Sequence, residues 1–275
     1  MTRILPALLF ITLLNGCSKT EEYQVFAIKF SDGWRIRAKD VVIGSEPSDS
    51  VDVCNMFWLL KSQDGRNILV DAGYVDTTNS NKKYIRPDSM LLRLGLGDKD
   101  ISDIILTHPH YDHISGITLF PKAKVWMQQE DYNYFIGPAW QENGDNRGFE
   151  KRDVENILSV NSQGRLNLIK GDNIEIFPGI KVFTGSKHTF ENQYLVVNSN
   201  SKKNKILLAS DAIWFYLNLE KELPVSICMD TAAYVKEIKR MDTLVPNRDL
   251  VIPGHDNKVF SKFPAVQDRI VRIEE

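Results

Sequence analysis

Cysteine is scarce in this sequence, with three residues in 275. Cys54 and Cys228 lie far apart, and two cysteines at such a separation do not by themselves indicate a bridge. An oxidising compartment would permit them to pair. We expect both to be buried free thiols.

An excess of positive charge is also lacking. The 34 Lys and Arg residues are balanced by 36 Asp and Glu residues, which gives a formal net charge of −2. A mildly acidic balance does not provide the basic surface that nucleic acid requires, so we expect no nucleic-acid partner.

Beyond the N-terminus there is no second hydrophobic segment, no low-complexity tract and no repeat. Hydrophobic residues make up 43% of the chain, enough for a core of its own. We therefore expect residues 23–275 to form one folded domain.

The N-terminus is typical of a secretory signal. Arg3 precedes a short apolar run at 4–14, and Leu14-Asn15-Gly16-Cys17 follows. That last segment resembles the bacterial lipobox, whose cysteine becomes the lipidated first residue. We predict a lipoprotein signal peptide at 1–16, lipidation of Cys17 and a tether at 17–22. The chain would then be an exported outer-membrane lipoprotein, on the periplasmic or surface face, held only by its lipid; the alternative is an ordinary signal peptide with an incidental cysteine.

The sequence has five histidines, and all of them fall in positions that suit one kind of metal site. Three form an H-x-H-x-D-H cluster, one stands alone, and one follows Pro253-Gly254. A buried-strand pattern at 207–211 ends on a carboxylate. Together these motifs supply seven candidate ligands: His108, His110, Asp112, His113, His188, Asp211 and His255. Seven are too many for one tetrahedral ion but suit two divalent ions that share a carboxylate.

The order of these motifs resembles that of the metallo-β-lactamase-fold hydrolases. The segment ILVDAG at 68–73 also resembles the strand and acidic turn that precede the histidine cluster in that fold. Four motifs in this order are far more specific than one histidine motif. The resemblance implies an α/β (α+β) fold, the four-layer αβ/βα sandwich.

The resemblance also implies how the ligands divide. The first ion would take His108, His110 and His188, the second would take Asp112, His113 and His255, and Asp211 would bridge them. Imidazole and carboxylate ligands suit zinc, the ion we expect, and also accommodate iron, manganese or cobalt. We expect Asp71 to accept a hydrogen bond from a ligand histidine. Asp256 could do the same, and a strand-terminal Asp211 is also typical of a helix N-cap.

Within the fold, the sequence most resembles the N-acyl homoserine lactonases. The shared features are Asp112-His113, Gly254-His255-Asp256 and an early strand-rich segment. The resemblance implies a hydrolase that opens an acyl lactone or ester with a hydroxide held between two metal ions. Asp112 would also carry a proton to the leaving group.

Other activities of the fold stay open, including those of arylesterases, β-lactamases and phosphodiesterases. True β-lactamases of this fold lack the bridging aspartate, so Asp211 disfavours that activity. The absence of a basic face disfavours nucleases and phosphodiesterases. A non-catalytic metal-binding surface lipoprotein is a further alternative, which the complete ligand set disfavours.

Two aromatic segments are predicted to shape a pocket for an acyl or aromatic group: Tyr132, Phe135 and Trp140 in one, Trp214 and Tyr216 in the other. The alternative is that they only cover the sheets. The lactonases carry a tyrosine three residues after the bridging aspartate, and it bonds the substrate carbonyl. Trp214 stands there instead; because indole N–H can donate, Trp214 or Tyr216 is expected to replace that tyrosine.

Hydrophobic alternation and short apolar runs predict strands at 25–30, 56–61, 68–71, 104–106, 124–127, 166–169, 180–184, 194–197, 206–209 and 250–252. Helical periodicity predicts helices at 90–96, 129–135, 153–160 and 231–241.

If Cys17 carries a lipid, the protein will fractionate with membranes and incorporate labelled fatty acid. Cys17→Ser will remain a soluble or unprocessed precursor, because the acceptor thiol is gone. Wild-type protein that is wholly soluble and cleaved at another residue would contradict the lipidation.

Overall fold

The structure, a computed structural model, describes residues 21–76, 83–201 and 205–273. The predicted signal peptide at 1–16 and Cys17 lie outside the described residues, as does most of the predicted tether. Among the helices of the described part, none is long and apolar enough to cross a membrane.

Two sheets form the centre of the molecule. The first has the spatial order β12-β13-β1-β2-β3-β4-β5-β6. Its strands are β1 (Tyr23–Arg37), β2 (Ser50–Ser62), β3 (Asn67–Val70), β4 (Asp103–Ile105), β5 (Lys124–Gln128), β6 (Leu166–Ile169), β12 (Ala265–Gln267) and β13 (Ile270–Ile273). The second has the order β11-β10-β9-β8-β7. Its strands are β7 (Ile174–Phe177), β8 (Ile180–Thr184), β9 (Gln193–Asn198), β10 (Lys205–Ser210) and β11 (Val251–Pro253).

The helices are mostly short. They are α1 (Pro87–Leu92), α2 (Tyr111–Ile114), α3 (Gln129–Ile136), α4 (Lys151–Ser162), α5 (Tyr216–Lys221), α6 (Thr231–Leu244) and α7 (Val259–Lys262). Single 3-10 turns lie at Ala38–Asp40, Asp98–Asp100, Ser115–Leu119, Pro138–Trp140 and Arg248–Leu250.

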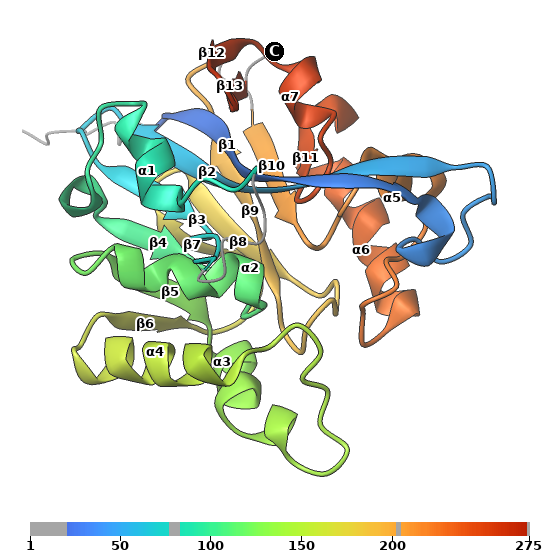
Figure 1. Ribbon diagram of the computed structural model, residues 1–275, viewed down its shortest axis with the longest axis horizontal. Helices are drawn as coiled ribbons and strands as arrows, with labels where there is room; N and C mark the ends of the chain where they lie inside the picture. Colours follow the sequence, from blue (N-terminus) through green and yellow to red (C-terminus); the bar gives the residue numbers. More distant parts are fainter. Residues whose placement is uncertain (1–20, 77–82, 202–204, 274–275) are drawn as a thin grey trace, which may run out of the picture.

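The layering follows from the alternation of side chains along each strand. On β2, Trp58 and Leu60 face the second sheet and pack against Val182 and Leu208. Their neighbours on β2 face the other way, toward α1, α3 and α4. The outer face of the second sheet is covered in the same manner by α5 and α6. Figure 1 shows the helices on both outer sides of the paired sheets, so the predicted four-layer αβ/βα sandwich is confirmed.

One feature extends beyond the sandwich. β1 and β2 continue past the sheet as a long hairpin, residues 31–53, which we call the arm; in Figure 1 it is the blue ribbon that reaches toward α5. The arm is pinned to the second half of the chain by an antiparallel bridge between Val42 and Val225. The backbone N–H of Ser226 also donates to Val41 O at 2.9 Å.

Both described cysteines are free, as predicted. Cys54 is fully buried on β2, whereas Cys228 is only half-buried, so the prediction of a buried thiol is right for the first and too strong for the second.

Candidate metal centre

All the predicted ligands are delivered to one edge of the two sheets by the turns that follow strands. They lie after β4 (His108, His110), on α2 (Asp112, His113), between β8 and β9 (His188), after β10 (Asp211) and after β11 (His255). The structure therefore brings together residues that span almost 150 positions of the chain.

The first group consists of His108, His110, His188 and Asp211, all buried, with potential ligand atoms within 4.8 Å of one another. His110 Nδ1 lies 3.0 Å from His108 Nε2 and 3.0 Å from His188 Nε2. Asp211 Oδ2 lies 3.2 Å from His188 Nε2. Three imidazole nitrogens and one carboxylate oxygen thus converge on one point.

The second group consists of Asp112, His113 and His255. Asp112 Oδ2 lies 3.7 Å from the Nε2 atoms of both histidines. The other oxygen of Asp211, Oδ1, lies 3.2 Å from His113 Nε2 and 3.0 Å from His255 Nε2. The two oxygens of Asp211 therefore face different groups, which is the arrangement of a bridging carboxylate.

Hydrogen bonds on the far side of the rings fix which nitrogen faces the centre. His113 Nδ1–H donates to Asp71 Oδ2 at 2.8 Å, which confirms the role predicted for Asp71. Thr107 Oγ1 donates to the same carboxylate at 2.9 Å, so it accepts from His108 Nδ1–H at 2.9 Å. Both rings therefore turn Nε2 toward the centre, the nitrogen through which each could bind a metal.

His255 is oriented by the backbone instead. Its Nδ1–H donates to Cys54 O at 3.0 Å, and Cys54 N donates to His255 O at 2.9 Å. Asp256, for which the same role was open, accepts from the backbone N–H groups of Tyr216 and Lys258. It therefore holds the local turn and orients no ligand ring.

The backbone beside the cluster is strained. Asp71, Lys187 and Ser210 have φ values of 63°, 54° and 46°, in the left-handed region that side chains with Cβ atoms seldom adopt. The first orients His113, and the other two directly precede His188 and Asp211. Such strain is concentrated at functional sites, where the surrounding structure holds it in place.

Gly148 lies so close to the His110 ring that no other residue fits at this position. A Cβ on Gly148 would lie 2.7 Å from His110 Cδ2, and its φ is +78°. The loop after Trp140 can therefore pass directly over the His110 ring only with glycine at this position.

The pKa values of the ligand residues shift in different directions. Desolvation would raise the pKa of Asp211, but the imidazoles of His255 and His113 lower it well below its usual range. Desolvation opposes protonation of His113, yet the carboxylates of Asp211, Asp112 and Asp71 raise its pKa well above the ordinary value. Burial and neighbouring rings lower the pKa of His108 and His110.

The residues fit divalent cations. Asp211 Oδ1 and His113 Nε2 are buried atoms without a hydrogen-bond partner, although they face each other across the second group. A cation between them would supply the partner that each lacks. A donor set of imidazoles and carboxylates, without thiolate, suits zinc and also accommodates iron, manganese or cobalt.

A pocket of about 330 Å³ opens onto the cluster. His110, Asp112, Asp211 and His255 form its polar end. Its apolar and aromatic side chains are Trp34, Ile36, Val41, Val53, Tyr74, Tyr111, Trp214, Phe215 and Ile227. The arm supplies four of these side chains, Trp34, Ile36, Val41 and Val53, a contribution that the sequence did not predict.

Of the five aromatic residues predicted to line the pocket, Trp214 alone does so. Tyr132 and Phe135 lie in the core between α3 and the first sheet, and Trp140 packs against them. Their helix turns its apolar face to the sheet, and Phe149 lies between the Phe135 and His110 rings. The alternative that these residues cover the sheets is correct.

Tyr216 does not line the pocket either. Its ring packs in the core between the sheets, and its hydroxyl is buried without a partner. Trp214 Nε1–H donates to Asp211 Oδ2 at 2.6 Å. Its single donor is therefore directed at the carboxylate of Asp211. Neither Trp214 nor Tyr216 is in a position to replace the substrate-binding tyrosine of the lactonases.

Comparison with known proteins agrees with this geometry. Residues 50–255 match the family model of the Metallo-beta-lactamase superfamily, and the chain belongs to that family. The predicted family is thus confirmed.

Among its relatives, an N-acyl homoserine lactonase from a Bacillus species is 26% identical over 230 residues, covering 76% of this chain and 84% of that protein. The N-acyl homoserine lactonase AttM of Agrobacterium fabrum is 23% identical over 214 residues, and the match covers 77% of this chain and 72% of that protein. The crystal structure of a quorum-quenching N-acyl homoserine lactone lactonase superposes with a TM-score of 0.71 at 22% identity, over 90% of this chain and 98% of that one. These relatives are hydrolases, and the predicted enzyme class is confirmed with the family.

Asp211→Asn tests whether the carboxylate is shared. The amide keeps the shape but loses the charge, so we expect metal content to fall from two ions toward one or none and kcat to fall by orders of magnitude, with less change in KM. Elemental analysis and steady-state kinetics measure both. Asp153→Asn, which alters an equally buried carboxylate on α4, is the control and should keep both ions. An Asp211→Asn protein with two ions and near-native turnover would contradict the bridge.

Asp71→Asn tests the orientation of His113. Asparagine tolerates the left-handed backbone at this position, but its amide is a weaker acceptor for His113 Nδ1–H than the carboxylate. Loss of such a partner costs about 10- to 100-fold in metal affinity, which a competition titration against a chelator would measure. Asp256→Asn, next to His255 but bonded to backbone only, should leave the affinity unchanged. Equal affinities in all three proteins would rule out this role.

Proposed function

We propose that this chain is a dinuclear metal-dependent lactonase that opens N-acyl homoserine lactones or chemically similar esters. The observation that carries the proposal is the position of Asp211, whose two oxygens face two separate ligand groups. Zinc is the proposed ion. The names of the relatives support the substrate class.

Lewis-acid activation of the substrate carbonyl and of the attacking water is the chemistry that two divalent ions supply in such a site. The chain's own residues place the reacting groups. Asp112 lies at the polar end of the pocket and is less buried than the other candidate ligands, with a side-chain exposure of 14%. It is the group that takes the proton of the attacking water and returns it to the leaving alkoxide.

The pocket suits a neutral substrate with an apolar part. Among the described residues that line it there is no lysine or arginine, so apart from the proposed metal ions it offers no cation for a phosphate or sulfate group. Its apolar wall would bind an acyl chain by removing that chain from water.

We also propose that the enzyme works at a membrane surface, anchored through a lipid on Cys17. The support comes from the sequence alone: a signal-like N-terminus and the Leu14-Asn15-Gly16-Cys17 segment. Acylhomoserine lactones diffuse as small neutral molecules, so an exported enzyme would meet them outside the cytoplasm.

A substrate panel tests the function. We expect the metal-loaded protein to hydrolyse acylhomoserine lactones with a higher kcat/KM than a simple aryl ester, a cephalosporin or a phosphodiester. Chelation should abolish turnover, and restored zinc should return it. Hydrolysis of the phosphodiester in preference to every lactone, or no turnover of any substrate at full metal occupancy, would overturn the proposal.

A further inference from the structure

Trp34 is the most exposed of the large hydrophobic side chains in the described part of the chain, at 72%. A single exposed apolar side chain needs no explanation by itself. Trp34 differs because it stands at the apolar wall of the pocket that opens onto the metal centre.

The local backbone directs this side chain. Asp32 pairs with Cys54 and Arg35 pairs with Asp52, so Gly33 and Trp34 together oppose one residue of β2. This is a β-bulge, a feature that re-aims a side chain out of the regular alternation. Gly33 makes the close approach possible, since a Cβ there would lie 2.8 Å from Val53 O.

The wall behind Trp34 is held in place at both ends of the arm. Near its base, a bridge joins Val53 to Asp256, the neighbour of His255. Near its tip, Ile43 N donates to Pro224 O at 2.9 Å, next to the Val42–Val225 bridge. The groove between the arm and residues 214–227 is therefore fixed before any ligand arrives, which lowers the cost of binding.

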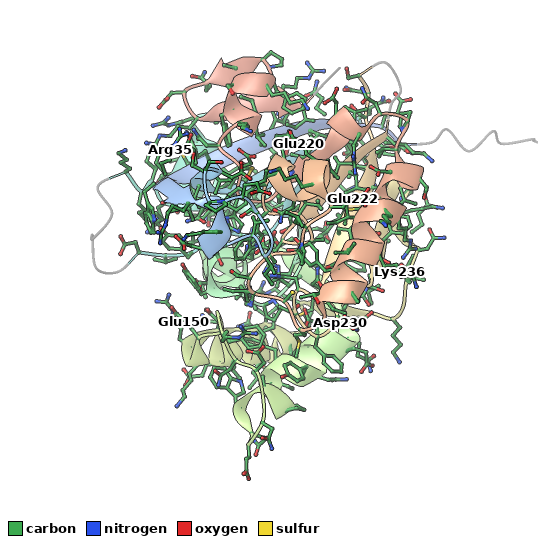
Figure 2. All side chains as sticks on the ribbon, turned by 90° about the vertical axis from the view of Figure 1, so that its right-hand side faces the viewer. Arg35, Glu150, Glu220, Glu222, Asp230 and Lys236 are labelled. Atoms are coloured by element: carbon green, nitrogen blue, oxygen red, sulfur yellow. The ribbon has the colours of Figure 1, made fainter. Side chains whose placement is uncertain are left out.

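Figure 2 looks at the molecule from the side of the arm's tip. Arg35, the neighbour of Trp34, lies at the upper left on the arm, and Glu150 lies below it, close in sequence to the Gly148 that covers His110. Gly33, Trp34 and Gly148 all line the pocket, so the bulge and the loop that covers His110 border the same space.

We propose that Trp34 is a specificity-determining residue that packs over the acyl chain of the substrate. This inference rests on the proposed lactonase function. With the scissile carbonyl at the cluster, the first part of an acyl chain lies between Val53 and Phe215, and its distal part reaches the indole, which is exposed at the mouth of the pocket. Trp34 therefore distinguishes long acyl chains from short ones and takes no part in the chemical step.

The kinetic test compares the purified full-length protein with Trp34→Ala on butanoyl, hexanoyl, octanoyl, decanoyl and dodecanoyl homoserine lactones. Each methylene that enters the groove should raise kcat/KM of the wild type about fourfold. Trp34→Ala should lose about tenfold on the longest chains, through KM, and leave the butanoyl substrate unchanged. Trp34→Phe should recover most of the loss, because the phenyl ring replaces much of the apolar surface.

Leu92→Ala is the matched control. Leu92 is 65% exposed on α1 and does not line the pocket, so its removal should change no substrate. A uniform loss across all chain lengths in Trp34→Ala, or no loss at all, would overturn the role of Trp34 while leaving the lactonase function intact. Failure to hydrolyse any acyl lactone would remove both.

A binding measurement gives a readout independent of turnover. Titration with the ring-opened product N-decanoyl-L-homoserine should shift the wild-type tryptophan emission to the blue as the exposed indole leaves water. Trp34→Phe should lose that shift, and N-butanoyl-L-homoserine should not produce it in either protein. The same shift in Trp34→Phe would assign it to Trp214 and contradict the proposal.

Discussion

The structure of the site depends on one buried carboxylate, that of Asp211, which is surrounded by four histidines. An ionised carboxylate away from water requires nearby positive charge or hydrogen bonds. Here Oδ2 faces His108 and His188, and Oδ1 faces His113 and His255. Two cations held by these rings would satisfy both oxygens. Asp211 follows β10, its oxygens face the ligand rings, and it also lines the pocket.

The surrounding shell keeps the carboxylate in position. Asp71, which follows β3, accepts hydrogen bonds from Thr107 after β4, His113 on α2 and Ser210 at the end of β10, and so ties these elements together. Trp214 donates to Asp211 from the pocket side. The strained conformations of Asp71 and Ser210 persist because this network over-determines them.

Much of the fold and the ligand set could be predicted from the sequence, because buried strands and metal motifs are local patterns. All ten predicted strands are found, and the seven candidate ligands converge. The prediction missed β7, β12 and β13 among the strands. β12 has three residues, all exposed, and β7 and β13 have four each, too few for a hydrophobic pattern to stand out. The prediction also misplaced the pocket, because aromatic content cannot distinguish a helix face that covers a sheet, as on α3, from a pocket wall. The arm reaches the site by long-range pairing, such as Val53 with Asp256, which no local pattern indicates.

Anomalous diffraction at the absorption edge of the bound metal tests whether two ions share Asp211. We expect two peaks about 3.5–4 Å apart, one on each side of the Asp211 carboxylate, with His108, His110 and His188 around the first and Asp112, His113 and His255 around the second. A fully loaded protein with a single peak, and with Asp211 Oδ1 hydrogen-bonded to a protonated His255, would contradict it.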